Sequence, residues 1–513
     1  MSGLTRPAAS SPLAFGAVVA DVVGDFDTAA RRWPDRPAVV HNRTAIPYRL
    51  LVERVRVVAA RCATGALGDA KSAAGLVGVL VSHDPSVADH LLGILLADAT
   101  YCPVDASSPA GRQAAVATAL GVSHLVPAGE IPLARPEQSG MLPMPRWRGA
   151  DAAYVLCTSG STGTPKPAVI SRRALTVTVR ALRKLFALTP EDRVLQFASL
   201  GWDTCLEEIL PALTAGAAVV FDDRAHTGSF PTFLRMLADQ EITVLDLPTA
   251  FWHELVLWLD EEGAALPGCV RLVIIGGERV DPTRLQQWRG LDTGRIRLLN
   301  TYGCTETTMI THAVTLCGPG AEPGLEIPDG EAPIGRPLPH VRDHISDDGE
   351  LLVSGPGLAT GYLGAAEATA AAFPVADHGD GPQRWFATGD LVIRGENGLL
   401  YVRGRADQQV KVRGVRVHPA EVEMQLTTHP AVARAVVMGE RLLEGTALTA
   451  YVVASRETTG AELRRYLGER LPSQFVPSRV RFIKELVYTP SGKVDRAATQ
   501  RAVADQNNEG ACQ

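Results

Sequence analysis

Residues 154–167 read YVLCTSGSTGTPKP, and the rest of the chain is interpreted outward from this stretch. The apolar run from Ala152 to Cys157 predicts a buried strand. It leads into a loop of glycine, serine and threonine that ends at Lys166, where Gly160 and Gly163 allow backbone paths that other residues resist. Such a loop turns N–H groups, hydroxyls and a lysine toward one anion, so we expect a polyphosphate ligand, although no Walker A pattern is present. The alternative is a flexible linker, but a linker seldom follows a buried strand and seldom ends on a lysine.

The composition of the 513 residues indicates a globular protein with more than one domain. Hydrophobic residues make up 46% and charged residues 21%, and the net charge of -6 argues against a general nucleic-acid binder. The eight cysteines form no CxxC pair, which fits a reducing cytoplasm. The segment MSGLTRPAASSPLAF has no apolar signal core, and runs such as 91–97 are too short to span a bilayer. We therefore expect a cytoplasmic protein without a membrane association.

Apolar strands alternate with helical patterns through most of the chain, which predicts an α/β fold with parallel-rich sheets. The expected strands include 78–82, 194–198, 217–221, 242–247, 270–275 and 296–299. Several end in polar or glycine-rich segments, and ligands of open α/β sheets bind at such strand ends. From Gly349 onward, short alternating strands predict a small antiparallel region. A small α+β pattern follows, so we divide the chain into a large N-terminal domain, 1–404, and a C-terminal domain, 405–513.

Six motifs occur in a fixed order: TSGSTGTPK, NTYGCTET, GELLVSGPGLATGYL, FATGDL, GRADQQVKVRGVRV and TPSGKVDR. Together they resemble the adenylate-forming superfamily of acyl-CoA synthetases, luciferases and peptide-synthetase adenylation domains. The resemblance covers residues 30–497. The segments QVKVRG, LPSQFVP and SGKVDR resemble the nonribosomal peptide synthetase branch most closely.

This resemblance implies that the chain binds ATP and Mg²⁺. The implied ATP-binding residues are Thr158, Ser159, Gly160, Ser161, Thr162, Gly163, Thr164, Lys166, Gly277, Glu278, Tyr302, Thr305, Asp390 and Arg405. Glu306 is the implied Mg²⁺ ligand, a role that suits a hard carboxylate. Lys493 is implied to bridge the substrate carboxylate and the α-phosphate, and to be carried there by a mobile small domain with its hinge at Asp407. The alternatives are an ordinary solvated lysine at 493 and ordinary turn residues at 390 and 407.

Two positions depart from the family pattern. Pro167 stands where the family usually has glycine, which stiffens the exit of the loop. Cys304 stands where it usually has proline. We interpret Cys304 as a packing or turn residue, because no histidine near it in the sequence supplies a base for a nucleophile.

The resemblance also implies a substrate pocket, lined by Asp203, Thr204, Glu207, Asp246, Ile274, Gly276, Thr301, Met309, Ile310 and Lys493. Asp203 matches the aspartate that pairs with the amino group of an amino-acid substrate. Glu207 and Asp246 add two acids, and three carboxylates in a partly apolar pocket repel one another unless the ligand brings positive charge. We therefore expect a small basic amino acid with a second ammonium group. The alternative is that one acid faces solvent or a structural arginine.

Lysine, ornithine, arginine and β-lysine all satisfy this charge argument. Resemblance favours β-lysine, because the pocket is similar to β-lysine-activating domains of streptothricin- and tuberactinomycin-type antibiotic pathways. No carrier motif follows Arg496, so we expect a stand-alone enzyme that acylates the phosphopantetheine thiol of a separate carrier protein. An acyl-CoA ligase, an amide ligase that acylates an amine directly, and a non-catalytic binding module are alternatives. A need for a small MbtH-like partner stays open.

Overall fold

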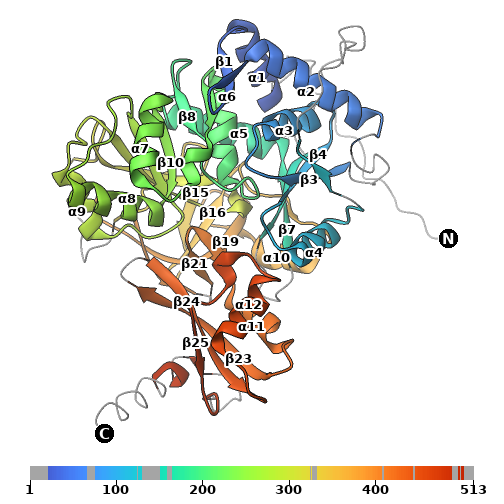
Figure 1. The fold of residues 1–513 in the computed structure, drawn as a ribbon, viewed down its shortest axis with the longest axis vertical. Coiled ribbons are helices and arrows are strands. Elements are labelled where there is room, and N and C mark those ends of the chain that lie inside the picture. Colours follow the sequence, from blue (N-terminus) through green and yellow to red (C-terminus); the bar gives the residue numbers. More distant parts are fainter. Residues whose placement is uncertain are drawn as a thin grey trace.

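The computed structural model describes residues 21–65, 67, 75–123, 125–129, 151–158, 165–323, 325, 332–406, 409–442, 445–487, 495–496 and 498–501. The confirmed fold class is α/β, with a large N-terminal part and a smaller C-terminal part, which is drawn in orange to red in Figure 1. None of the helices in these ranges combines the length and the apolar character needed to cross a bilayer.

The largest sheet has nine strands, in the order β14-β13-β12-β11-β10-β8-β9-β1-β2. Its central strands from β12 to β1 are mutually parallel. Their apolar runs, such as VIIG in β11, are typical of parallel strands that are covered on both faces. The bounds are β1 (Pro37–His41), β2 (Thr44–Pro47), β8 (Arg193–Leu195), β9 (Ala218–Phe221), β10 (Val244–Pro248), β11 (Leu272–Gly276), β12 (Arg297–Gly303), β13 (Ile310–Cys317) and β14 (Arg336–Pro337).

A second sheet of six strands has the order β17-β7-β6-β4-β3-β5. Its strands are β3 (Leu76–Val81), β4 (Thr100–Asp105), β5 (Val126–Pro127), β6 (Ala152–Thr158), β7 (Lys166–Ser171) and β17 (Gly361–Tyr362). The predicted buried strand is β6, and it pairs antiparallel with β7, so that Thr158 stands opposite Lys166. The two ends of the predicted polyphosphate loop therefore lie side by side.

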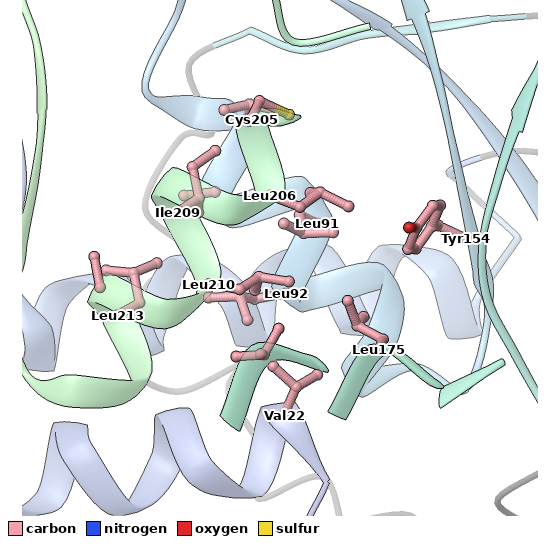
Figure 2. Packing of buried hydrophobic residues seen from close by; sticks show 14 of the residues in the cluster. Val22, Leu91, Leu92, Tyr154, Leu175, Cys205, Leu206, Ile209, Leu210 and Leu213 are labelled. Atoms are coloured by element: carbon pink, nitrogen blue, oxygen red, sulfur yellow. The ribbon is translucent and has the colours of Figure 1, made fainter. Parts of the chain in front are cut away.

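One apolar cluster joins the facing sides of these two sheets and the helices between them. In Figure 2, Leu206 and Leu210 of α6 point toward Leu91 and Leu92 of α3. The helices of this layer are α1 (Val22–Arg32), α2 (Tyr48–Ala63), α3 (Ser86–Leu96), α5 (Arg172–Leu185) and α6 (Thr204–Ala215). The helix α6 ends at Ala215 and is followed by Gly216, whose φ of 84° fits the left-handed position that terminates a helix.

A second apolar cluster covers the other face of the nine-stranded sheet. The helices on this face are α7 (Phe230–Asp239), α8 (Thr249–Glu262) and α9 (Pro282–Gly290). The helix α4 (Ala110–Leu120) borders the outer face of the six-stranded sheet.

The predicted antiparallel region is a five-stranded sheet of β15 (Arg342–Ile345), β16 (Glu350–Ser354), β18 (Val375–Asp377), β19 (Pro382–Arg394) and β20 (Leu400–Arg405). The helix α10 (Ala366–Ala372) precedes β18. After this sheet the chain forms a hairpin of β21 (Val410–Val412) and β22 (Val415–Val417). The small part then has α11 (Pro419–Thr427), α12 (Gly460–Gly468) and a sheet of β23 (Val432–Leu442), β24 (Gly445–Ala454) and β25 (Arg479–Phe482) around its own apolar core.

The main difference from the predicted elements concerns the strand expected at 194–198. The observed β8 ends at Leu195. Beyond it, the N–H groups of Phe197 and Ala198 donate to the buried carboxylate of Glu208, each at 2.9 Å. A side chain has replaced a neighbouring strand as the partner of this backbone, so the strand is shorter than its apolar sequence suggests.

Candidate active site

The carboxyl ends of β10, β11 and β12 open into a cavity of about 270 Å³. The short helix η3 (Thr305–Thr307), the start of α6 and the β21–β22 hairpin close its other sides. The predicted residues that line it are Thr158, Asp203, Thr204, Glu207, Asp246, Gly276, Gly277, Thr301, Thr305, Glu306, Met309, Ile310, Asp390 and Arg405. Positions far apart in the sequence therefore meet at one edge of the sheet, as expected for an open α/β fold.

The carboxylate of Glu306 lies beside the ends of the β6–β7 loop. Its Oε1 accepts hydrogen bonds from Tyr362 Oη at 3.0 Å and from Thr158 Oγ1 at 3.2 Å. The Nζ of Lys166 lies 5.7 Å from the centre of the Tyr362 ring. Residues 159–164, which carry the predicted Ser159, Gly160, Ser161, Thr162, Gly163 and Thr164, lie outside the described residues. The described ends of the loop place hydroxyl groups and one cation next to a buried acid.

The oxygen groups around Glu306 fit a magnesium ion. Mg²⁺ is usually held by one or two carboxylates together with phosphate oxygens, and Glu306 is a 4% exposed carboxylate with two hydroxyl groups beside it. The guanidinium of Arg416 approaches Glu306 Oε2 at 3.9 Å. These residues can therefore hold a divalent cation together with a polyphosphate.

Asp390 is held by two protein groups. Tyr302 Oη donates to its Oδ2 at 2.6 Å, and Arg405 Nη1 donates to its Oδ1 at 2.5 Å. Glu278 Oε1 accepts a hydrogen bond from the Gly414 N–H at 2.7 Å, which links the segment after β11 to the hairpin. A methyl group at Gly277, whose φ is 82°, would lie 3.1 Å from the Gly414 Cα, so glycine is needed for this close approach.

The β21–β22 hairpin brings cations that the sequence interpretation missed. Lys411, Arg413 and Arg416 all line the cavity, and Lys411 Nζ lies 5.1 Å from the centre of the Tyr302 ring. Burial lowers the pKa of Lys411. The alternating pattern KVRGVR was the available signal, since it places positive charges along a hairpin that follows the predicted hinge.

Three acids form the inner side of the cavity. Asp203 and Glu207 are one helical turn apart at the start of α6, and Asp246 lies on β10. Their exposed fractions are 9%, 8% and 5%. Within the described residues, Asp203 Oδ2 and Asp246 Oδ2 are buried without a hydrogen-bond partner.

Burial dominates the titration of these acids. It raises the pKa of Asp203 to about 6, although a hydrogen bond from Thr305 acts in the opposite direction. It raises the pKa of Asp246 to about 7. Burial and then the nearby Asp246 raise the pKa of Glu207 well above its usual range. The cavity therefore favours a ligand that brings positive charge to these carboxyl groups.

Two further predicted positions shape this pocket. Thr301 Oγ1 donates to the Ile275 carbonyl at 3.0 Å, and a methyl group at Gly276 would lie 2.6 Å from that hydroxyl. Ile274 pairs with Asp246 across β10 and β11, but it packs in the apolar core and does not line the cavity.

The two remaining predicted residues, Lys493 and Asp407, lie outside the described residues. Arg496, near Lys493 in the sequence, pairs with Glu423 of α11 and donates to the Val437 carbonyl of β23 at 2.9 Å. These partners do not line the cavity.

Cys304 packs against Thr307, with 3.3 Å between Sγ and Oγ1. Burial raises the pKa of its thiol to about 12, so the reactive thiolate is disfavoured. This agrees with the interpretation of Cys304 as a packing or turn residue.

A larger cavity of about 1210 Å³ adjoins the first one. It lies between the six-stranded sheet, the segment 197–202 and α12 of the small part, and it shares Phe197, Trp202 and Gln474 with the inner cavity. Four arginines line it: Arg112, Arg413, Arg464 and Arg465. The strand-end cavity is therefore bordered by a wide positively charged cleft.

Comparisons with known proteins were made for both sequence and fold. The family model described as "AMP-binding enzyme" matches residues 26–363, and the model "AMP-binding enzyme C-terminal domain" matches residues 421–493. The isonitrile lipopeptide synthase of Streptomyces coeruleorubidus is 39% identical over 91% of this chain and 32% of its own length. The chain spans a third or less of the length of the first curated relatives it matches.

Two solved structures illustrate the shared fold. An artificially fused adenylation–PCP di-domain from Klebsiella oxytoca has a TM-score of 0.77 at 23% identity, covering 90% of this chain and 93% of that one. An amide bond synthetase, McbA from Marinactinospora thermotolerans, has a TM-score of 0.76 at 23% identity, covering 93% and 98%.

Proposed function

The chain belongs to the family of AMP-binding enzymes and is a ligase of the adenylate-forming type, and on that premise we propose that it activates a basic amino acid, with β-lysine favoured. In the proposed reaction a carboxylate oxygen of the amino acid attacks the α-phosphorus of ATP. The bond to the β-phosphate oxygen breaks, and aminoacyl-AMP and pyrophosphate form. Catalysis then consists mainly of aligning and neutralising two anions.

The single observation that supports the basic substrate is that one carboxyl oxygen on Asp203 and one on Asp246 have no hydrogen-bond partner among the described residues. A buried carboxylate without a partner is costly, because no protein group replaces the hydrogen bonds that water would donate to it. A ligand with one ammonium at Asp203 and a second at Glu207 and Asp246 supplies both missing partners. L-lysine, ornithine and arginine meet the same requirement, and β-lysine is preferred among them on resemblance alone.

In this proposal the nucleotide residues have the roles that the resemblance implies. Thr158, Lys166 and Glu306 would hold the phosphates and Mg²⁺, and the ion would supply charge neutralisation between phosphate oxygens. Gly276, Gly277 and Glu278 would form one wall of the adenine pocket. Lys493 would contact the substrate carboxylate and the α-phosphate. In the present arrangement Asp390 already accepts from Tyr302 and Arg405, so a ribose would share or replace these contacts.

We propose that the acyl group then passes to the phosphopantetheine thiol of a carrier protein. The cleft with four arginines beside the inner cavity supports an acceptor that carries a phosphate. The adenylation–PCP di-domain of similar fold supports a carrier as the acceptor, whereas McbA, an amide bond synthetase, keeps direct transfer to an amine as the alternative. Coenzyme A, an acyl-CoA ligase's acceptor, is a further alternative. A requirement for an MbtH-like protein is tested by adding one.

The position of the β21–β22 hairpin supports a small domain that begins at residue 405. This domain would rotate about Asp407 between two orientations. Lys411 and Arg416 line the cavity in this orientation, whereas Arg496, which is close to Lys493 in the sequence, packs against β23. This arrangement suits the transfer step, and a rotation would bring Lys493 in for adenylation.

An ATP–pyrophosphate exchange screen across amino acids tests the proposed activity. β-Lysine, L-lysine, ornithine and arginine should support exchange, and norleucine, which has the lysine chain without its terminal ammonium, is the matched control. A preference for norleucine, leucine or phenylalanine would overturn the basic-substrate proposal. A preference for L-lysine over β-lysine would overturn only the choice of β-lysine.

A further inference from the structure

The turn that follows η3 carries residues from both sides of the candidate site. Glu306 on η3 lines the cavity beside Thr158 and Tyr362. Met309, three residues later, lines the same cavity and is 2% exposed. Thr308 lies between them, is fully buried and is not part of the cavity wall. The conformation at Thr308 therefore fixes a carboxylate and an apolar wall of the site together.

The backbone of this turn is strained. Seven non-glycine residues in the described part of the chain have a positive φ, and Thr308 and Met309, at 60° and 66°, are the only two of them that are adjacent in the sequence. This left-handed region is unusual for a β-branched residue such as threonine, and strained conformations persist only where the surrounding structure fixes them. The turn therefore needs an anchor that keeps Thr308 in this conformation.

The anchor is a hydrogen bond to a segment that is distant in the sequence. The hydroxyl of Thr308 donates to the Gly357 carbonyl at 2.6 Å. Close to it, the Ala359 N–H donates to the Glu306 carbonyl at 2.8 Å. The carbonyl of Ala359 in turn accepts from Arg384 Nη1 at 2.8 Å, which ties the segment to β19. The strained turn is thus attached at two points to a segment that the antiparallel sheet holds in place.

The turn has little space to relax away from the cavity. A methyl group at Gly303 would lie 1.8 Å from the Met309 carbonyl oxygen, and one at Gly357 would lie 3.3 Å from the Thr307 carbonyl oxygen. The backbone is therefore closely packed on both of these sides. If the hydrogen bond of Thr308 is lost, relaxation of the turn moves the residues on its cavity side.

We propose that Thr308 is a positioning residue for adenylation. Its hydroxyl, bonded to the Gly357 carbonyl, holds the strained turn so that Glu306 and Met309 keep their places in the cavity. The inference rests on the proposed function for the roles of these two residues as magnesium ligand and as substrate-pocket wall. Without the hydroxyl, Glu306 is held less firmly, so adenylation requires more Mg²⁺. A less firmly held Met309 discriminates less between amino acids that differ by one methylene, such as L-lysine and ornithine.

Three substitutions in the full chain separate the hydroxyl from the backbone strain. Thr308→Ser keeps the hydroxyl, Thr308→Val keeps the shape and loses the hydroxyl, and Thr308→Gly loses the hydroxyl but tolerates the positive φ. The first measurement is hydrogen exchange of the amides of 303–311 in the absence of ligands. The second is the Mg²⁺ concentration that gives half-maximal ATP–pyrophosphate exchange, and the third is the ratio of L-lysine to ornithine activity.

Thr308→Ser should behave like the wild type in all three measurements. Thr308→Val and Thr308→Gly should show faster hydrogen exchange in 303–311 and a ratio of L-lysine to ornithine activity closer to one. Their half-maximal Mg²⁺ concentration should rise by roughly threefold to tenfold, the size expected for the loss of one hydrogen bond.

Thr214→Val on α6 is the matched control. It removes a buried hydroxyl that donates to the Leu210 carbonyl at 2.8 Å and does not line the cavity. The change should lower the melting temperature and leave the Mg²⁺ dependence as it is, because a half-maximal concentration does not depend on the amount of folded enzyme.

The outcomes separate this inference from the function on which it rests. An unchanged Mg²⁺ dependence in Thr308→Val would overturn the inference even if hydrogen exchange in the turn is faster, because the hydroxyl would then have a structural role only. Wild-type behaviour of Thr308→Gly would also overturn it, since the turn would keep its place without the anchor. If Thr308→Val does not fold, the comparison of Thr308→Ser with Thr308→Gly decides the question. A wild-type enzyme that is inactive with basic amino acids would overturn the proposed substrate instead, and the Mg²⁺ dependence with the amino acid that it does activate would still decide the role of Thr308.

Discussion

The side chains of Arg112 on α4 and Glu421 on α11 form a buried ion pair between the large and the small part of the chain. The exposed fractions are 10% for the arginine side chain and 0% for the glutamate side chain. The same guanidinium lies 5.7 Å from the centre of the Phe475 ring in the small part. Burial raises the pKa of Glu421, and Arg112 acts against this rise. The pair joins the two parts in the orientation in which the hairpin fills the strand-end cavity.

Removal of this pair should shift the balance between the two half-reactions. We expect Glu421→Gln to slow acyl transfer by roughly tenfold or more, because breaking a buried pair leaves Arg112 uncompensated at a cost of about 3–5 kcal/mol. Adenylation should be kept, since it uses another orientation. The exposed pair of Arg49 and Asp35 supplies the control, and Arg49→Ala should change neither rate. Equal losses in pyrophosphate exchange and transfer would contradict this role.

Neutralising Glu207 of α6 or Asp246 of β10 should weaken binding of the substrate. Glu207→Gln or Asp246→Asn should raise KM for the diamino substrate by roughly tenfold or more, because truncating one partner of a buried charge pair costs about 2–5 kcal/mol. The KM for ATP should change little. The double variant should lose less than the sum, since both acids share one cation.

Glu208→Gln is the matched control for these variants. Its carboxylate accepts backbone hydrogen bonds, so the change should lower thermal stability and leave the ratio of lysine to norleucine activity unchanged. Loss of selectivity in this variant, with selectivity retained in Glu207→Gln, would reverse the assignment.

Lys493 and Lys411 should serve different half-reactions. Lys493→Ala should reduce pyrophosphate exchange by on the order of a hundredfold, since a charge contact made in the transition state contributes about 3 kcal/mol. Lys411→Ala should keep exchange and impair transfer, because Lys411 lies over Tyr302 in the present orientation. Near-normal exchange by a folded Lys493→Ala protein would remove that residue from the adenylation step.

The hinge assignment gives a separate prediction. Asp407→Pro should leave adenylation substantially intact and impair transfer, because proline fixes φ at a residue that has to rotate between the two steps. Both half-reactions are measured on the same preparation, together with its melting temperature. A parallel fall in both rates with a lower melting temperature would indicate a stability defect.

The pH dependence of substrate binding follows from the raised pKa of Asp246, about 7, which burial causes. The ammonium ligand binds the ionised pair, so KM for the diamino substrate should fall as the pH rises through 7. Below this value KM should rise by up to about tenfold per pH unit, as expected for the loss of one proton on binding. Exchange rates between about pH 6 and about pH 8 measure the effect, with norleucine as control. Parallel profiles for the two substrates would refute it.

Much of the architecture could be predicted because the local signals agree with the final fold. The apolar run before the glycine-rich loop is β6, and the α/β alternation and the late antiparallel sheet appear as expected. The strand at 194–198 was too long in the prediction, because the partner of its last residues is the distant carboxylate of Glu208. The cations Lys411, Arg413 and Arg416 were missed, since nothing local indicates that a hairpin will enter a cavity formed by other segments.

By itself, the sequence determined the family, the fold class and the set of polar residues at the strand ends, because ordered motifs and apolar periodicity are properties of the chain alone. The resemblance also implied that Asp203 and Glu207 line one pocket. Only the tertiary structure decided that Asp246 lines the same cavity as Glu207, while Glu208 turns to the backbone of 197–198. The physical reason is that the environment of a buried acid, and with it the proton it holds, is set by segments that are distant in sequence and adjacent in space.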